Sequence, residues 1–184
     1  MDIMEFFQLS EGRWKAIRTT HHLAFQRAET GQSEIVVQVL SADAPQVIET
    51  CQLHGIDAGL ALGGAYVSWK GEMEWDQEDE NHQGSTSFAL VKDMGHPWEG
   101  SLLRDRGYAE TIPAIGHYSM SVEDVLTLTT EYGVMSSTEQ FWFADPNIRL
   151  RTSTVSLSGG LTTTTFSSEI RVTETCHEDC PSHY

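Results

Sequence analysis

Cysteines and long apolar runs are both scarce in this chain of 184 residues. The cysteines are sparse and odd in number, so they do not suggest the disulfide framework of a small secreted domain: Cys51, Cys176 and Cys180. No segment approaches the ~20 consecutive apolar residues that a membrane-spanning helix needs, and residues 1–5 lack the basic region of a secretory signal. We therefore expect reduced thiols, a cytoplasmic location and no insertion into a membrane.

Basic residues are also scarce. Lysine and arginine together number 11 against 27 acidic residues, which gives a formal net charge of -16. This charge repels phosphate backbones over the Debye length, so nucleic acid is not an expected partner. An acidic small molecule would be repelled as well, unless several of the few arginines meet it locally. The positions of the arginines are therefore informative.

The rest of the composition is that of a globular protein. Hydrophobic residues make up 39% of the chain and charged residues 21%, both near the usual values for folded domains. A chain of this length can bury ~70% of the surface that its unfolded form exposes. We predict a single domain over residues 1–173 and a disordered tail over residues 174–184.

Two helices are expected, both in the first third of the chain. Asp2 can cap a short helix whose apolar residues fall largely on one side and which ends at Gly12. Such a helix suggests a lid or plug. The second helix is predicted near residues 43–54, where Asp43 and Pro45 mark the start and Gly55 can end it.

Most of the remaining chain is predicted to form strands. Residues 13–27 and 33–40 flank a loop at 29–32, and later strands are expected at 64–75, 84–91, 99–104, 107–111, 114–120, 122–130, 134–145, 148–158 and 161–172. Short links and almost no crossover helices indicate antiparallel pairing. We predict an all-β fold, an up-and-down antiparallel barrel of about ten strands that holds a ligand. A two-sheet sandwich is the competing architecture.

Side chains two apart on a strand share a face, so Phe141 and Phe143 form one stripe and Arg149 and Arg151 another. If the turn at residues 145–147 sets a symmetric register, Phe143 lies opposite Arg149 and Phe141 opposite Arg151. Glu139 lies one step further along the same face.

The next hairpin would add a second carboxylate to this face. If the turn at residues 158–160 centres the hairpin, Glu169 falls opposite Arg149. A face that mixes phenylalanine with arginine and glutamate is typical of a ligand cavity, which needs apolar walls and a few placed polar groups. The alternative, a surface ladder of ion pairs beside exposed aromatic residues, fits the residues equally well.

No metal or nucleotide site is predicted. His21 and His22 are adjacent on a strand and so point to opposite sides, which makes them a poor metal pair. Residues 176–180 include cysteine and histidine at close spacing but lack a second matching pair. The chain has no P-loop, dinucleotide fingerprint, zinc-protease motif or nucleophile elbow.

An ordered set of motifs resembles one known family. These are FFQLSEGRW at residues 6–14, RTTHHL at 18–23, CQLHGID at 51–57, the segment 69–75, EQFWF at 139–143 and DPNIRLR at 145–151. In this order they resemble the S-type (CpcS/CpeS) phycobiliprotein lyases over residues 5–173. The resemblance implies a lipocalin-like barrel, similar to fatty-acid-binding proteins.

The resemblance also implies an activity. Such proteins carry phycocyanobilin or phycoerythrobilin and promote its thioether linkage to a specific cysteine of a phycobiliprotein subunit. The expected partners are thus the phycobilin, as transferred substrate and not as a true cofactor, an apo-phycobiliprotein α or β subunit, and a second copy in a homodimer. The location would be the cytoplasm or plastid stroma of a phycobilisome-containing cell.

Strand parity and the resemblance together define the predicted site. The predicted catalytic residues are Glu139, Arg149 and Glu169. The predicted bilin-binding residues are Arg18, His21, Trp69, Trp75, Phe141, Trp142 and Arg151.

In the predicted mechanism, the arginines bind the propionates and the two tryptophans pack against the rings. Glu139, supported by Glu169, would hydrogen-bond the pyrrole nitrogens and keep the bilin protonated, and therefore electrophilic towards the partner's cysteine. Two other hypotheses remain: a non-enzymatic lipocalin-like carrier of fatty acid or bilin, and a structural assembly factor that binds subunits without pigment.

Overall fold

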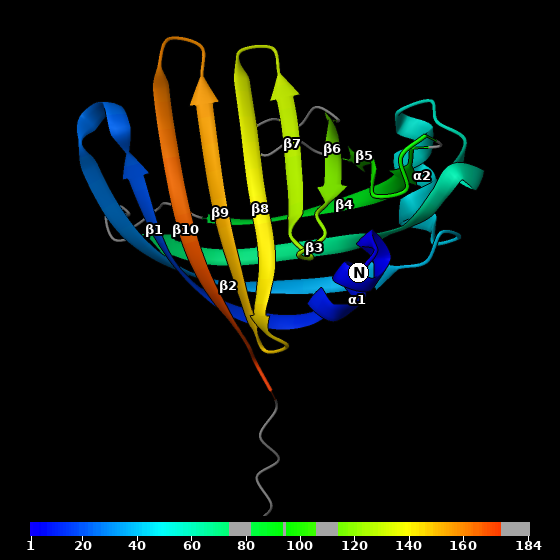
Figure 1. The fold of residues 1–184 in the computed structure, drawn as a ribbon, viewed down its shortest axis with the longest axis horizontal. Coiled ribbons are helices and arrows are strands. Elements are labelled where there is room, and N and C mark those ends of the chain that lie inside the picture. The colour runs from blue at the N-terminus through cyan, green and yellow to red at the C-terminus, as the bar shows by residue number, and fades with distance from the viewer. Residues whose placement is uncertain (74–81, 94, 106–113, 174–184) are drawn as a thin grey trace, which may run out of the picture.

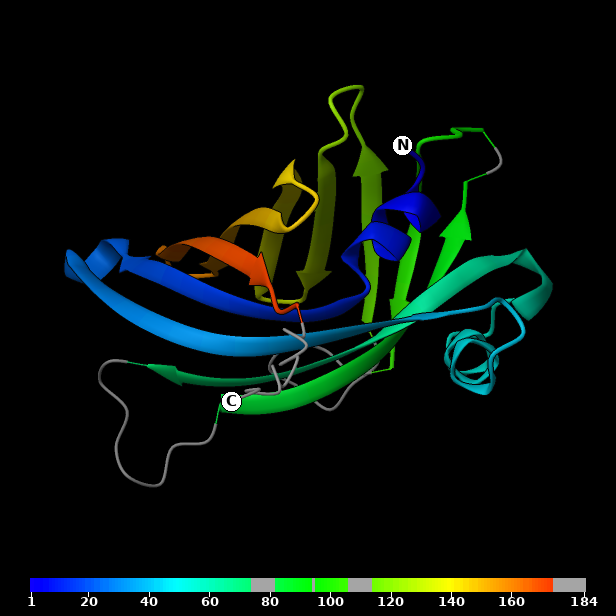
Figure 2. The ribbon, with the colours of Figure 1, turned by 90° about the horizontal axis from the view of Figure 1, so that it is seen from below.

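The structure, a computed structural model, describes residues 1–73, 82–93, 95–105 and 114–173, and its strands close into a barrel (Figures 1 and 2). The order around the barrel is β1-β10-β9-β8-β7-β6-β5-β4-β3-β2, and β1 pairs antiparallel with β10. This closure confirms the predicted all-β barrel and excludes the two-sheet sandwich. The strands are β1 Gly12–His22, β2 Arg27–Leu40, β3 Ala61–Met73, β4 His82–Lys92, β5 Glu99–Arg104, β6 Ala114–Met120, β7 Leu126–Tyr132, β8 Met135–Asp145, β9 Ile148–Leu157 and β10 Leu161–Arg171.

Helix α1 (Ile3–Ser10) covers part of the barrel interior, as the predicted plug would. It begins with a capping box: Asp2 Oδ1 accepts the Glu5 N–H at 2.8 Å, and the Glu5 carboxylate accepts the Asp2 N–H at 2.7 Å. Its buried side chains, Ile3, Phe6 and Phe7, join the main apolar cluster.

Helix α2 (Pro45–Leu53) lies on the outside of the barrel and packs against β3 and β4 (Figures 1 and 2). Pro45 stands in its first turn, where a missing N–H costs nothing, and Gly55 follows its end with φ +65°. Val47 and Cys51 pack with Ala89 in a second cluster, and burial raises the pKa of the Cys51 thiol. In the chain as described, no helix has both the length and the apolar character that crossing a membrane requires.

The first hairpin differs from the predicted one. The loop expected at residues 29–32 is wrong, because β2 runs through these positions and the chain reverses at the 3₁₀ helix η1 (Leu23–Phe25). Gln26 completes the reversal in the left-handed region, with φ 51° and its N–H bonded to the Leu23 carbonyl. Gly31 is instead buried within β2 opposite Arg18. A glycine in a strand often marks a close approach and not a turn.

One of the later strands begins further along the chain than predicted. The strand predicted at residues 122–130 occupies 126–132, because Ser121 and a left-handed Asp124 (φ 60°) form a turn first. The strand predicted at 107–111 and the tail at 174–184 lie outside the described residues.

The apolar core and the charged interior occupy different walls. The main apolar cluster joins α1 to the inward faces of β1–β7. The inward faces of β8, β9 and β10 instead carry buried charged side chains, namely Glu139, Arg149 and Glu169. Arg104, at the end of β5, is a fourth buried charged residue, and Phe141 and Phe143 of β8 pack against the apolar cluster.

Candidate functional site

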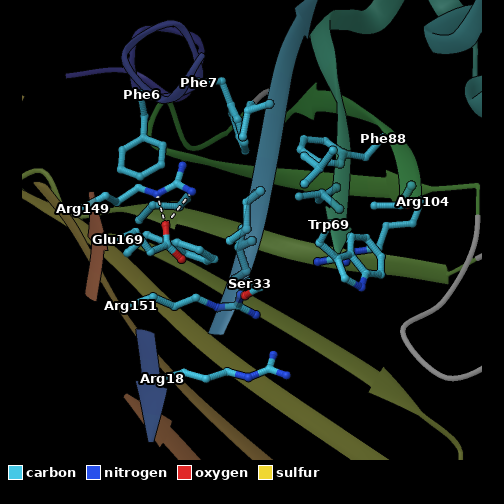
Figure 3. A pocket seen from close by; sticks show the side chains of 18 residues that line it. Phe6, Phe7, Arg18, Ser33, Trp69, Phe88, Arg104, Arg149, Arg151 and Glu169 are labelled. Carbon is cyan, nitrogen blue, oxygen red and sulfur yellow. Dashed lines mark hydrogen bonds and ion pairs between the residues drawn. The ribbon is translucent and has the colours of Figure 1, made fainter. Parts of the chain in front are cut away.

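A cavity of about 280 Å³ lies inside the barrel beneath α1 (Figure 3). Its wall is mostly apolar, with side chains from α1 and from every strand except β6. Figure 3 shows Arg18, Arg149, Arg151 and Glu169 along one wall, with Arg104 beside Trp69 on the other. The lining residues are Phe6, Phe7, Arg18, Ser33, Ile35, Val37, Val67, Trp69, Thr86, Phe88, Leu102, Arg104, Leu126, Leu128, Phe141, Arg149, Arg151 and Glu169.

The charged wall forms through two hairpin registers that the sequence predicts. Phe141 lies opposite Arg151 and Phe143 opposite Arg149 between β8 and β9. Glu169 lies opposite Arg149 between β10 and β9. Both predicted registers are confirmed, although a bulge interrupts β8 near its turn.

Arg149 and Glu169 form a buried ion pair in this wall. Nε and Nη2 of Arg149 both lie 2.6 Å from Glu169 Oε2, and the two side chains are only 6% and 0% exposed. Burial lowers the pKa of Arg149 below its ordinary value, while the charge and hydrogen bond of Glu169 oppose that shift. The guanidinium also lies 4.8 Å from the centre of the Trp14 ring. Arg149 is thus held between a carboxylate and an aromatic ring.

Glu139 forms the second buried charged group. Its Oε1 accepts a hydrogen bond from Arg151, and its Oε2 lies 3.7 Å from Nη2 of Arg104. The Glu139 side chain is 2% exposed. Each carboxylate oxygen therefore has a guanidinium beside it.

Arginines gather in the cavity, although they are scarce in the chain as a whole. Four arginines line it, and the buried carboxylates of Glu139 and Glu169 pair with three of them, Arg104, Arg149 and Arg151. The whole chain carries -16. Such a cluster of guanidiniums favours an anionic ligand, which the rest of the molecule would repel.

Aromatic rings complete the wall. Trp69 lies opposite Gly84, where an added Cβ would stand 2.5 Å from Trp69 Cζ2. The glycine therefore leaves the space that the indole occupies across β4. Phe141 lies under the guanidiniums of Arg151 and Arg149, at 5.1 and 5.8 Å from its ring centre.

Three predicted site residues are not among the side chains that line the cavity. Glu139 is buried and contacts two of the lining arginines, Arg104 and Arg151. His21 is exposed on the outer face of β1, and Trp142 is half-buried on the face of β8 opposite to that of Phe141. Neither side chain is part of the cavity wall. The reason is strand alternation: Arg18 and Phe141 point inward, so His21 and Trp142 point outward. Trp75, the other predicted tryptophan, lies outside the described residues.

Arg104 lines the cavity, although it was not among the predicted site residues. It ends β5 two residues after the buried Leu102, and this parity is the signal that could have placed it inside. Its backbone is held at that point, because the His54 ring lies 2.9 Å from its carbonyl oxygen. The next residue, Asp105, accepts the Ser87 N–H at 3.0 Å.

Metal ligands do not gather in the described ranges, where no group of three or more His, Cys, Asp or Glu side chains is placed to hold an ion. The cysteine and histidine motif at residues 176–180 lies outside those ranges.

Comparison with known proteins assigns the barrel to a family. A family model described as CpeS-like protein matches residues 2–172, which span α1 and all ten strands. The chain belongs to the CpeS-like family. This confirms the family that the sequence motifs predict.

Relatives in the CpeS-like family are similar over nearly their whole length. The chain is 56% identical over 171 residues to the phycocyanobilin lyase subunit CpcS of Picosynechococcus sp. (strain PCC 7002), covering 93% of this chain and 86% of that one. It is 54% identical over 174 residues to the chromophore lyase CpcS/CpeS 2 of Synechocystis sp. (strain PCC 6803), covering 95% and 91%. The solved structure of the S-type phycobiliprotein lyase CPES from Guillardia theta matches with a TM-score of 0.84 at 31% identity, covering 95% of each chain.

Proposed function

We propose that this chain is a chromophore lyase, which binds a phycobilin in the barrel and promotes its thioether attachment to a cysteine of a phycobiliprotein subunit. The observation that carries the proposal is the cavity lined by arginines and aromatic rings inside a CpeS-like barrel. The lyase names of the relatives at 54–56% identity support the same activity.

The chemistry of a bilin matches the cavity group by group. A bilin is an open-chain tetrapyrrole with apolar rings, two propionates and a row of pyrrole nitrogens. The two propionates would bind guanidiniums among the four arginines that line the cavity. Guanidinium forks suit carboxylates because they bind them through paired hydrogen bonds. Trp69 and Phe141 provide ring faces for packing against the pyrroles.

The reaction is an addition in which the phycobilin is the substrate. The thiolate of the partner's cysteine attacks the A-ring ethylidene carbon, a C–S bond forms, and the A ring takes up one proton as its exocyclic double bond is lost. The chain contributes by holding the bilin in one conformation and exposing one face to attack. The buried carboxylate of Glu139, supported by that of Glu169, favours the protonated, electrophilic form of the bilin. No cysteine of this chain takes part.

The finer assignments are part of the same proposal. We propose phycocyanobilin as the bilin, since a relative at 56% identity is named for it. The acceptor would be an α or β apo-subunit, the lyase would act as a homodimer, and the reaction would take place in the cytoplasm or plastid stroma.

The proposal is tested by reconstitution. Purified chain, phycocyanobilin or phycoerythrobilin, and a panel of apo-subunits are mixed, and the chromophore that stays on the subunit after denaturation is measured. We expect R149A and E139A to lower that yield at least about tenfold, because each removes one partner of a buried charge pair. The exposed Arg13, whose side chain is 60% exposed, supplies the matched control R13A with unchanged yield. Equal yields with and without the chain would refute the lyase assignment.

A simple carrier of fatty acids makes a different prediction. A fatty acid has one carboxylate and no N–H donors, so it would engage fewer of the arginines and would offer no hydrogen bond to the buried carboxylates. Competition between phycocyanobilin and palmitate, followed by visible absorption, distinguishes the two ligands. We expect palmitate to displace the bilin only at large excess.

A further inference from the structure

His22 and Glu29 form a contact at the end of the barrel away from α1. Strand β1 begins directly after α1 and ends at His22, so its 11 extended residues separate the two (Figures 1 and 2). His22 Nε2 lies 2.9 Å from Glu29 Oε1. The side chains of His22 and Glu29 are 31% and 13% exposed. The carboxylate is therefore mostly buried, while the imidazole can be reached from outside.

The imidazole of His22 faces the interior of the barrel. Strand alternation puts His22 on the same face as Arg18, which lines the cavity, and the exposed His21 on the opposite face. Thr20 stands between Arg18 and His22 on that face, and its hydroxyl lies 3.1 Å from that of Thr165 on β10. Four residues of an extended strand span about 13 Å. His22 therefore lies between the cavity and the solvent at this end.

The contact with Glu29 prepares the imidazole to take up a proton. A carboxylate accepts hydrogen bonds but donates none, so the neutral imidazole donates its Nε2 hydrogen to Glu29. This tautomer leaves a lone pair on Nδ1, where a proton can bind. The carboxylate also stabilises the imidazolium that then forms. A histidine oriented in this way by a carboxylate is the arrangement that activates nucleophiles in many enzymes.

The proposed function needs a group that takes a proton from the acceptor's cysteine. The thiolate is the nucleophile, and a thiol with the ordinary pKa of ~8.5 is only about 3% ionised at pH 7. Arginines hold their protons, and the buried carboxylates of Glu139 and Glu169 contact guanidiniums. Because α1 covers the interior at the opposite end, we place the approach of the acceptor at the end where His22 is exposed.

We propose that His22 is the general base of the attachment reaction and that Glu29 is the positioning residue that orients it. The inference rests on the proposed function. Nδ1 of His22 takes the proton of the acceptor's thiol, and the thiolate attacks the A-ring ethylidene carbon. As the C–S bond forms, the electron pair of the exocyclic double bond moves to the neighbouring ring carbon, which takes the proton back from the imidazolium. The sum is the addition of S–H across that double bond, with His22 unchanged.

The charged groups that face His22 within the described strands both come from β2. Glu29 contacts the ring, and Arg27 pairs with His22 in the strand register. Strand β10 presents Thr163 at this position, and η1 carries no charged residue. Glu29 is therefore the described anion that stabilises the imidazolium.

The pH dependence of a single turnover tests the role of His22. The chain is loaded with phycocyanobilin and mixed with an excess of apo-subunit, and covalent attachment is followed from pH 6 to pH 9.5. At pH 7 we expect H22Q to slow attachment by about 10- to 30-fold, since about 30-fold is the most that ionising a thiol of pKa ~8.5 can contribute. At pH 9.5 the thiol ionises without help, so the rate in H22Q should come within about twofold of that of the unmodified chain.

A second variant and a matched control complete the test. E29Q keeps the size of the side chain but not its charge, so it should show a smaller loss at pH 7 and the same recovery at pH 9.5. His117 and Glu99 form a similar contact at 3.6 Å with both side chains exposed, so H117Q should keep the rate of the unmodified chain at every pH.

The outcomes separate this assignment from the proposed function. An unchanged rate in H22Q at pH 7, or a loss that persists at pH 9.5, would overturn the role of His22 as a base. If H22Q does not fold, an unchanged rate in E29Q at pH 7 overturns it equally. Failure of the unmodified chain to speed attachment at any pH would instead refute the proposed function.

Discussion

Single residues matter most where charges are removed from water in pairs. Arg149 and Glu169 contact each other at 2.6 Å in a fully buried setting, whereas Arg13 and Glu34 lie 3.6 Å apart on the surface, with both side chains more than half exposed. The buried pair has lost its hydration, so each partner depends on the other. The exposed pair is solvated with or without its partner.

A double-mutant cycle measures this difference. We expect R149M to lower the free energy of unfolding by about 3–5 kcal/mol, because it leaves a buried carboxylate unpaired. The double variant R149M/E169Q should recover about half of that loss, since the remaining charge is gone as well. Urea unfolding followed by circular dichroism gives the values. The surface control R13M should change stability by less than about 1 kcal/mol, and a similar loss in R149M would contradict the argument.

Tyr118 is a core residue whose ionisation makes the free energy of unfolding depend on pH in the alkaline range. Burial raises the pKa of its phenol to about 12, above the ~10 of an exposed tyrosine. Since the folded value is the higher one, the stability that the neutral phenol contributes is complete below pH ~10 and is lost as the pH rises through about 12. We expect the unfolding free energy to fall less between pH 9 and 11.5 in Y118F than in the unmodified chain. An identical fall in both proteins would show that Tyr118 titrates normally.

At the scale of secondary structure, α1 is the element that joins the barrel to its cavity. Phe6 and Phe7 line the cavity, and the Phe6 ring lies 5.2 Å from that of Phe143 on the charged wall. Arg171 donates to the carbonyls of Leu9 and Glu11 at the end of the helix and so attaches it to β10. The position of the plug thus depends on the packing of its phenylalanines and on the Arg171 contacts at its C-terminal end.

The capping box at the start of α1 can be removed selectively. We expect D2A to lower the free energy of unfolding by about 1 kcal/mol, because the Glu5 N–H loses its acceptor. Amide hydrogen exchange in residues 3–10 should accelerate, while exchange in β8–β10 stays unchanged. D2S, which restores an acceptor oxygen, should return both values towards those of the unmodified chain. Uniform acceleration over the whole barrel would mean that α1 does not open independently.

At the scale of the whole molecule, the distribution of charge is uneven. A chain with a net charge of -16 repels a second copy of itself over most of its surface. The outer faces of β1, β9 and β10 instead expose apolar side chains next to one another: Ile17, Ile148, Phe166 and Ile170. An exposed apolar patch in a charged protein is typical of an interaction surface. This face supports the proposed homodimer.

Replacing one residue of this face tests the homodimer. We expect F166E to shift the protein from dimer to monomer in sedimentation velocity, because it adds a charge to a desolvated contact. The control I115E places the same charge on β6, where Ile115 is 52% exposed, and should leave the mass unchanged. A dimer that persists in F166E would place the contact elsewhere.

Sequence reasoning predicted the local features of the fold well. Strand alternation, turn residues and helix caps act between neighbours in the chain, and they predict α1, α2, the strands and the two hairpin registers that set Glu139, Arg149 and Glu169 on one face. The first hairpin was missed because Gly31 satisfies both a turn and a buried strand position.

The amino-acid order by itself thus determined the strands, their alternation and the family. Alternation specifies two faces but not which of them becomes the interior, so only closure of the barrel put His21 and Trp142 outside and Arg104 inside. It also decided that Glu139 lies between two guanidiniums while one oxygen of Glu169 stays open. The physical reason is that hydrogen bonding and burial depend on residues brought together from strands far apart in the chain, which short-range patterns do not encode.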